Sequence, residues 1–304
     1  MLTIEPGREH MGATVRGADL SNPLTARDFG VVLEAIGRHG LLRFPDQNLD
    51  PVQQKAFAVQ FGRVPPIRGR LAPFTAPGVP EVNILSNILD ENGKNIGAVD
   101  AGVIWHTDMV HNETPGFANV LYARMVPRRG DQVLGGTQFI NLGAAYDGLS
   151  ADVKARIKDA KGIVSGESYM SLERKPAGDY GVNTHKGAAK PPIAHPLVLN
   201  HPISGRKILY CDLGHIDRIE GVAGDDGSLL IFLLEHLLQP QFRFLYQWTV
   251  GDVVIWDNLS SLHQAVFDYG PDEHRLMWRC QIEGEKVFNP AFVKTALADA
   301  KAVA

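Results

Sequence analysis

Short apolar runs separated by turn residues dominate the second half of this chain. They occupy residues 194–200, 207–211, 242–248, 253–256, 264–267 and 276–283. One helical pattern, at residues 225–238, interrupts them. Many short strands divided by turns are typical of an antiparallel sandwich or barrel. The pattern therefore predicts a mainly β protein with a few flanking helices.

The first half of the chain mixes both kinds of element. Its strand-like runs fall at residues 1–20, as an opening pair, and at 40–45, 82–85, 116–126 and 137–140. Helical spacing appears at residues 24–39, 51–61 and 141–157. Thr25 and Asp50 can cap the first two helices, because their side-chain oxygens accept hydrogen bonds from the first turn. Pro51 then fits the first helical position.

No internal repeat and no strong break in composition divides the chain, so we expect residues 1–304 to form a single domain. Two segments differ from the rest. Residues 62–103 are rich in proline and glycine, and residues 165–192 carry glycine, lysine and proline with little periodicity. The first is expected to be a flexible linker or a lid over a site, and the second a long loop or insertion.

The charge balance limits the classes of partner. The net charge of −4 and the isoelectric point of about 6.3 give no reason to expect nucleic acid or an anionic membrane. No apolar run is long enough to predict a transmembrane helix. The N-terminus shows no signal-peptide pattern, so Cys211 and Cys280 are expected to be buried thiols in a reducing cytoplasm.

The tetrapeptide WHTD at residues 105–108 places two metal-binding side chains, His106 and Asp108, one residue apart. On a β-strand, residues i and i+2 point to the same face, so the imidazole and the carboxylate would converge. The best third ligand is His263, and two histidines with one carboxylate form the facial triad of non-haem Fe(II) oxygenases. For the first two residues alone, a hydrogen-bonded couple without metal is the simpler interpretation. The remaining histidines considered lack a partner at strand spacing and are predicted to be structural or surface residues: His111, His195, His201, His215 and His236.

Two arginines, Arg275 and Arg279, lie four residues apart at the last predicted strand, whose apolar residues indicate burial. Strand spacing points both side chains toward one cavity. Buried arginines need anions, and this segment offers only Asp272 and Glu273 nearby. A ligand carboxylate gripped by a guanidinium fork is the functional interpretation, and a pair of solvated charges is the alternative.

Together these motifs resemble the Fe(II)- and 2-oxoglutarate-dependent dioxygenases of the taurine dioxygenase and chlorophenoxyacetate dioxygenase family. The resemblance covers nearly the whole chain. It rests on GA at residues 12–13, GADL at 17–20, FPDQ at 44–47, WHTD at 105–108, HPISGR at 201–206, WDN at 256–258 and R-x-x-x-R at 275–279. It implies a double-stranded β-helix (jelly-roll, cupin-like) core that uses Fe(II), 2-oxoglutarate and O₂.

The resemblance also implies roles residue by residue. His106, Asp108 and His263 match the iron ligands. Arg275 and Thr137 match the residues that hold the distal carboxylate of 2-oxoglutarate. The family usually has one residue between its glycine pair and this threonine, and the present chain has none.

Arg279 matches the position that contacts the anionic group of the substrate in the taurine enzyme, or the cosubstrate in other members. Arg70 is a second candidate for a substrate contact, as is Arg68, and plain surface charge is the alternative for both. The resemblance implies an oxidoreductase that hydroxylates a small anion, namely a sulfonate, sulfate ester or aryloxyalkanoate, with release of succinate and CO₂ and cleavage of a C–S or C–O bond. Asp108 argues against a halogenase, in which that carboxylate is absent. We also expect a homo-oligomer, either a dimer or a tetramer.

Two alternatives use the same residues differently. A zinc-dependent hydrolase could hold a metal-bound water with His106, Asp108 and His263, but it would not need Arg275 and Thr137 beside them. A non-catalytic β-sandwich binding protein would have the fold without the chemistry. An intact triad with an arginine behind it disfavours that interpretation.

Overall fold

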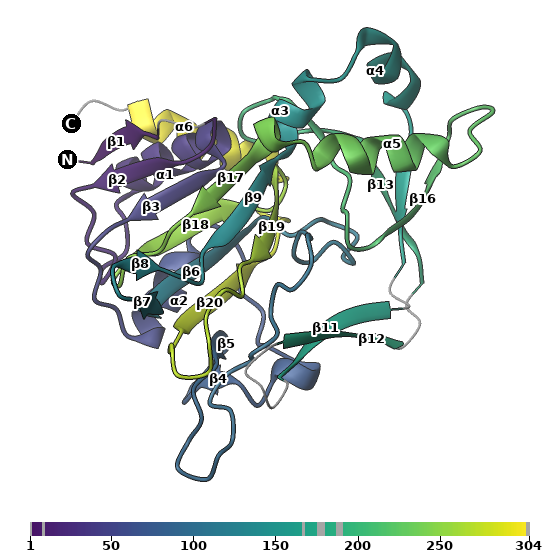
Figure 1. The fold of residues 1–304 in the computed structure, drawn as a ribbon. Coiled ribbons are helices and arrows are strands. Elements are labelled where there is room, and N and C mark those ends of the chain that lie inside the picture. The colour runs from purple at the N-terminus through teal and green to yellow at the C-terminus, as the bar shows by residue number, and fades with distance from the viewer. Residues whose placement is uncertain (1, 8–9, 166–167, 175–179, 187–190, 302–304) are drawn as a thin grey trace.

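The largest element of the fold is an eight-stranded sheet (Figure 1). The computed structural model describes residues 2–7, 10–165, 168–174, 180–186 and 191–301. All neighbouring strands of this sheet are antiparallel except β2 and β3. In spatial order the strands are β1 (Thr3–Pro6), β2 (Ala13–Arg16), β3 (Leu41–Phe44), β18 (Val253–Asp257), β6 (Ala118–Met125), β20 (Leu276–Ile282), β5 (Val79–Ser86) and β4 (Thr75–Ala76).

A smaller antiparallel sheet faces the large one. Its strands, in spatial order, are β17 (Arg243–Tyr246), β9 (Thr137–Asn141) and β19 (Ser261–Ala265). The two sheets share a hydrophobic core, in which Phe139 of β9 meets Trp256 of β18 with ring centroids 5.5 Å apart. The predicted architecture, mainly β with flanking helices, is confirmed.

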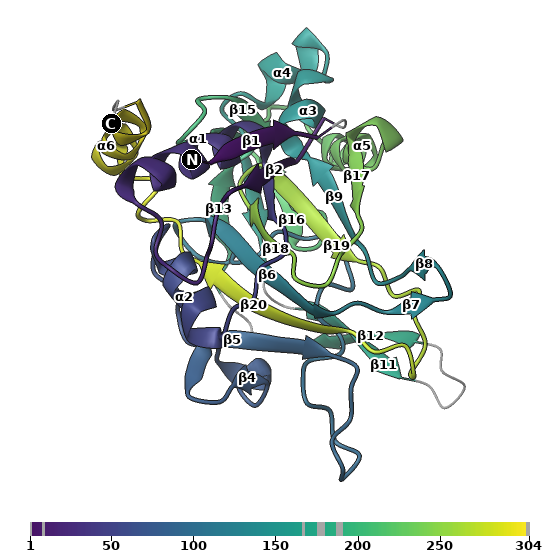
Figure 2. The ribbon, with the colours of Figure 1, turned by 90° about the vertical axis from the view of Figure 1, so that its left-hand side faces the viewer.

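Two helices, α1 (Ala26–His39) and α2 (Pro51–Val59), cover the other side of the large sheet, as Figure 2 shows. A third, α6 (Pro290–Lys301), packs against α1. Both predicted caps are present: Thr25 accepts a hydrogen bond from the Asp28 amide, and Asp50 forms a capping box with Gln53. Helix α1 buries its apolar face against the sheet, so its helical spacing reports a real core contact.

Smaller units complete the described part of the chain. The strands are β7 (Arg128–Arg129) with β8 (Gln132–Val133), β11 (Ser168–Arg174) with β12 (Tyr180–Lys186), β14 (Val198–Asn200) with β15 (Lys207–Leu209), and β10 (Lys161–Val164) between β13 (Ile193–Pro196) and β16 (Ile216–Glu220). The helices are α3 (Leu142–Asp147), α4 (Ala151–Ile157), α5 (Ser228–Leu237) and the 3₁₀ turns η1 (Gly69–Leu71) and η2 (Pro240–Phe242).

The single helical stretch predicted at residues 141–157 is wrong, because two helices occupy it. Gly148 ends α3, and the Ser150 side chain accepts a hydrogen bond from the Val153 amide to start α4. The run at 194–200 is likewise two strands, which pair with different partners. Helix α6 was not predicted from the sequence.

The loop predicted at residues 165–192 contains a β-hairpin, formed by β11 and β12. The prediction rested on Gly, Lys and Pro, which cluster at 175–179 and 187–190, outside the described residues. The residues before the first cluster and between the two clusters pair as strands, so composition alone obscured them. The segment at 62–103 contains η1, β4 and β5, and β5 is wholly part of the large sheet.

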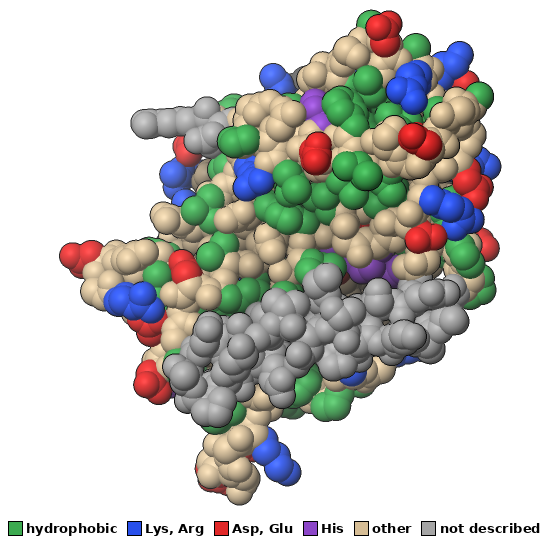
Figure 3. All heavy atoms as spheres, turned by 45° about the vertical axis from the view of Figure 1, so that its right-hand side comes forward, with side chains coloured by type: hydrophobic (Ala, Val, Ile, Leu, Met, Phe, Trp, Pro, Cys, Tyr) green, Lys and Arg blue, Asp and Glu red, His purple; other side chains and the backbone are tan. Residues whose placement is uncertain are grey.

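Helix α5 is unusually apolar on its outer side. Ile231 and Phe232 are 61% and 43% exposed. Figure 3 shows hydrophobic side chains gathered on the side of the molecule where α5 lies. Within the described ranges, no helix has the length and apolar character needed to cross a membrane.

Candidate metal centre

The WHTD segment is held against strand β19 by its backbone. The His106 amide donates to the His263 carbonyl at 3.1 Å, and the His263 amide donates to the His106 carbonyl at 2.8 Å. His106 forms only this isolated bridge, and Asp108 already belongs to a turn. The expectation that both lie on one strand is therefore wrong. Met109, with φ of 61°, reverses the chain directly after Asp108.

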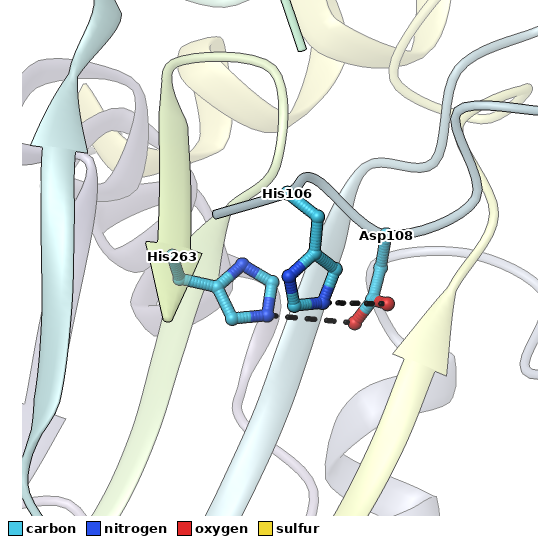
Figure 4. A group of neighbouring side chains, drawn as sticks. All are labelled: His106, Asp108 and His263. Carbon is cyan, nitrogen blue, oxygen red and sulfur yellow. Dashed lines mark ion pairs between the residues drawn. The ribbon is translucent and has the colours of Figure 1, made fainter. Parts of the chain in front are cut away.

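The turn nevertheless brings the three predicted ligands together (Figure 4). The ligand atoms of His106, Asp108 and His263 all lie within 4.8 Å of one another. Nε2 of His106 is 3.6 Å from Oδ1 of Asp108, and Nε2 of His263 is 3.8 Å from Oδ2 of the same carboxylate. Two imidazoles and one carboxylate on one side of a shared point match the donor set of a divalent metal such as Fe(II).

Backbone contacts fix the ligand atoms of the first histidine. Nδ1 of His106 lies 2.7 Å from the Ile104 carbonyl oxygen, which can only accept a hydrogen bond. Nδ1 therefore carries the proton, and Nε2 keeps its lone pair for a metal. A main-chain carbonyl thus supplies the outer-shell partner that metal-binding histidines usually have.

The electrostatics suit metal binding as well. Burial raises the pKa of Asp108, but the positive Arg279 guanidinium, the two neighbouring imidazoles and the hydrogen bond from Asn119 outweigh burial and hold that pKa below its usual range. Burial, reinforced by the neighbouring His106, lowers the pKa of His263 well below its usual value. Asp108 is therefore ionised and His263 neutral near pH 7, as ligands must be.

Two cavities meet at this centre. The larger, of about 600 Å³ and open to solvent, is lined in part by Arg70, Asp100, His106, Asp108 and His215. The smaller has about 360 Å³ and lies deeper. Its lining residues include Thr137, Trp256, His263, Arg275 and Arg279. Because Arg279 lines both cavities and His106, Asp108 and His263 are divided between them, a metal there would face both spaces.

The smaller cavity is rich in hydrogen-bond donors. Arg275 is 7% exposed, and no carboxylate of the described residues forms an ion pair with it. Burial lowers the pKa of its guanidinium, although Tyr269 and Asp268 oppose the effect. The indole N–H of Trp256 is buried without a partner in the described chain. Nε of Arg275 donates to the Gly135 carbonyl at 3.2 Å. A buried guanidinium without a carboxylate and an unpaired buried N–H both fit an anionic ligand, since burying such groups alone is costly.

Thr137, which the resemblance assigns to 2-oxoglutarate, lies at the start of β9 and on the wall of the smaller cavity. Its Oγ1 accepts a hydrogen bond from Nε1 of Trp248 at 3.0 Å. The hydroxyl hydrogen can therefore point to a ligand. The missing residue before Thr137 has not moved the side chain away from Arg275, because both line the same cavity.

Arg279 is engaged with the candidate metal centre itself. Its Nη1 lies 3.5 Å from Oδ2 of Asp108, and Nη2 donates to Oδ1 of Asn83 at 3.3 Å. Its Nε is buried and has no partner among the described residues. The expectation that Arg275 and Arg279 point into one cavity is confirmed.

Arg70 lies at the mouth of the larger cavity rather than inside it. Its side chain is exposed and pairs with Asp100, with Nη1 2.8 Å from Oδ1. Arg68 is also exposed, but it does not line this cavity. The structure therefore separates two arginines that the sequence could not distinguish.

His215 was predicted to be structural or surface, but it lines the larger cavity. Its Nδ1 lies 2.8 Å from Oδ2 of Asp212, a spacing of three residues that could have marked the pair. Three other histidines do have structural roles, as predicted. His195 contacts the Val110 carbonyl, His236 contacts the Ala145 carbonyl, and His201 contacts the Asp257 carboxylate.

Comparisons with known proteins identify the family of this chain. The family profile described as "Taurine catabolism dioxygenase TauD, TfdA family" matches residues 3–281. The chain is 31% identical over 254 residues to the alpha-ketoglutarate-dependent 2,4-dichlorophenoxyacetate dioxygenase of Burkholderia sp. (strain RASC). The aligned residues cover 80% of this chain and 81% of the relative.

Two further relatives bear on the ligands. The alpha-ketoglutarate-dependent sulfate ester dioxygenase of Pseudomonas putida is 30% identical over 291 residues, covering 93% of this chain and 90% of the relative. The crystal structure of AAD-2 in complex with Mn(II) and N-oxalylglycine superposes with a TM-score of 0.70 at 27% identity, covering 94% of this chain and 98% of that one.

Proposed function

This chain belongs to the TauD, TfdA family of dioxygenases, and we propose that it uses Fe(II), 2-oxoglutarate and O₂ to hydroxylate a small organic anion. One observation carries the proposal. Two imidazoles and a carboxylate converge beside a buried arginine that has no carboxylate partner among the described residues. The first group suits Fe(II), and the second suits a carboxylate of 2-oxoglutarate.

We assign His106, Asp108 and His263 as the residues that hold Fe(II). Neutral imidazoles and an ionised carboxylate supply three ligands and leave room for exchangeable ones. Bound Fe(II) would activate O₂ with the two electrons released by decarboxylation of 2-oxoglutarate, so that one oxygen atom enters succinate and the other hydroxylates a C–H bond, with release of CO₂. The protein holds the reactants in register and limits the access of water to them.

We assign Arg275 and Thr137 to the distal carboxylate of 2-oxoglutarate. A guanidinium binds a carboxylate through two parallel hydrogen bonds, and the threonine hydroxyl adds a third donor. The depth of the smaller cavity and the burial of Arg275 support this placement. A zinc-dependent hydrolase has no use for these donors, and family membership favours the dioxygenase over that alternative.

The larger cavity is our candidate for the substrate site. Arg279 offers an unpartnered Nε between the two cavities, and Arg70 adds positive charge at the mouth. Relatives named for 2,4-dichlorophenoxyacetate and for sulfate esters act on compounds with one anionic end. We therefore propose a sulfonate, sulfate ester or aryloxyalkanoate whose hydroxylation leads to C–S or C–O cleavage.

A turnover screen tests this proposal. Enzyme with Fe(II) and 2-oxoglutarate is offered a panel of sulfonates, sulfate esters, aryloxyalkanoates and their uncharged analogues. We expect succinate release to rise only with anionic members of the panel. Turnover stimulated by the uncharged analogues alone would contradict the anionic substrate. Succinate release that no member of the panel stimulates would leave the dioxygenase chemistry intact.

We further propose that residues 1–304 form one domain around a jelly-roll core. The facing sheets and the shared core between β9 and β18 support it, as does a family match that spans residues 3–281. The parts of segment 62–103 that lie outside β4 and β5 form a lid in this proposal, supported by the place of Arg70 and Asp100 on the cavity wall. Segment 165–192 remains a second candidate for shaping access.

We also retain a homo-oligomer, a dimer or a tetramer, as a proposal. The exposed apolar residues of α5, Ile231 and Phe232, support self-association on that side. Sedimentation should show a smaller species for Ile231→Glu than for the parent chain. A cytoplasmic location is likewise proposed, and the free buried thiols of Cys211 and Cys280 support it.

A further inference from the structure

We propose that Asn119 is a positioning residue that sets the orientation of the Asp108 carboxylate. The inference rests on the proposed role of Asp108 as a metal ligand. Asn119 lies on β6, between Trp256 of β18 and Gln281 of β20, and is fully buried. No feature of the sequence marked it, because it belongs to none of the recognised motifs.

The contacts of the Asn119 amide define its role. Nδ2 donates to Oδ2 of Asp108 at 2.8 Å and to Oδ1 of Asn258 at 3.0 Å. An ionised carboxylate can only accept, so the group that faces Asp108 must be the amide nitrogen. Both amide hydrogens are then in use, and rotation of the amide would break both bonds.

The second partner, Asn258, is itself held rigidly. Its backbone amide donates to the Phe117 carbonyl at 2.8 Å, and its carbonyl accepts from Oγ1 of Thr107 at 2.7 Å. Asn258 therefore holds the WHTD segment through Thr107 and the Asp108 side chain through Asn119. It also lies three residues before the start of β19, which carries His263. The relay from Asn258 to Asn119 to Asp108 thus connects both parts of the metal centre.

Arg279 competes with the metal for the Asp108 carboxylate, and Asn119 restrains that carboxylate. Nη1 of Arg279 lies 3.5 Å from the same Oδ2 that Asn119 contacts at 2.8 Å. Without Asn119, the carboxylate is free to turn toward the guanidinium and form a closer ion pair. That rotation would weaken the metal site and also occupy an arginine that we assign to the substrate. A neutral amide prevents it without adding charge.

Two buried polar atoms of Asn119 and Asn258 lower the stability of the fold, which indicates that these side chains have a role besides stability. Oδ1 of Asn119 and Nδ2 of Asn258 are buried without a partner in the described part of the chain. Unsatisfied buried polar atoms are rare and call for an explanation. Fixing the metal-binding carboxylate supplies that explanation here.

Mn(II) titration tests the inference, because it reports metal affinity without 2-oxoglutarate, O₂ or turnover. Free Mn(II) is measured by its EPR signal for the parent chain, Asn119→Ala, Asn119→Leu and the control Asn141→Ala. Asn141 is also a buried asparagine, but it caps α3 and contacts neither Asp108 nor Asn258. We expect both Asn119 variants to bind Mn(II) roughly 10- to 100-fold more weakly, as outer-shell changes typically do. Asn141→Ala should bind like the parent.

Thermal unfolding of the same samples separates folding from positioning. The inference is supported if an Asn119 variant binds Mn(II) more weakly than the parent chain and its melting temperature is no lower than that of Asn141→Ala. Parent-like Mn(II) affinity in a folded Asn119 variant would overturn it and leave the proposed function untouched. If the parent chain itself fails to bind Mn(II), both the metal site and this inference fall.

Discussion

His106 and His263 exchange main-chain hydrogen bonds in both directions, at 3.1 and 2.8 Å. This isolated bridge joins a loop from the first half of the chain to a strand near its end. Since the two imidazoles are attached to paired residues, their ring centroids lie only 4.2 Å apart. The backbone thus brings two ligands together before any metal binds.

Replacing Asp108 should remove the only carboxylate of the centre. Asp108→Ala is expected to weaken Mn(II) binding by more than the roughly 10- to 100-fold of an outer-shell change, and to abolish substrate-dependent succinate release. Asp100→Ala is the matched control, because Asp100 lines the same cavity but pairs with Arg70. Equal metal affinity in the two variants would refute the assignment of Asp108.

Arg275→Leu should affect 2-oxoglutarate far more than metal. Loss of hydrogen bonds to a charged group, about 1.5–3 kcal/mol, predicts a rise of roughly 10- to 150-fold in the KM for 2-oxoglutarate. Arg275→Lys should have a KM for 2-oxoglutarate between those of the parent chain and Arg275→Leu. An ammonium keeps the positive charge but cannot form the two parallel hydrogen bonds of a guanidinium. Steady-state kinetics with a fixed substrate measure this. An unchanged KM in Arg275→Leu would show that the cosubstrate binds elsewhere.

Arg70 and Arg68 allow a direct comparison of two exposed charges. Arg70→Ala should raise the KM for an anionic substrate by at most about fivefold, since exposed charge interactions contribute about 1 kcal/mol or less. The effect should shrink as salt is added. Arg68→Ala should have no effect, because Arg68 does not line the cavity. Identical changes in both variants would indicate general surface charge instead of a contact at the mouth.

The two thiols should be inert in the folded protein. Burial, with Glu81 nearby, raises the pKa of Cys280 to about 12, and burial together with Asp212 raises the pKa of Cys211 as well. Neither thiol is then ionised near pH 8, so a disulfide reagent should label them only after denaturation. Rapid labelling of the native protein would contradict their burial.

The sequence predicted most of the architecture, since local patterns such as the caps at Thr25 and Asp50 suffice to locate α1 and α2. It also predicted the three clustered residues of the candidate centre, but for a partly wrong reason. Asp108 reaches the centre through a turn after His106, not through strand alternation. Motif spacing was more reliable here than the secondary structure assumed for it.

Other site residues could not be found from the sequence. Asn119 contacts Asp108 only because β6 lies between β18 and β20, and the order of strands in a sheet is not written in any local pattern. His215, in the turn before β16, lines the larger cavity, and no local sequence pattern indicates that this turn lies beside the metal centre. Such neighbours depend on tertiary register, which periodicity does not encode.

The central claim is that His106, Asp108 and His263 hold Fe(II) next to 2-oxoglutarate bound by Arg275. Its most direct test is the visible absorption spectrum of the metal-free protein after anaerobic addition of Fe(II) and then 2-oxoglutarate. We predict a weak charge-transfer band that needs both additions and is missing in Asp108→Ala. A folded parent chain that gives no band with both additions would contradict the account.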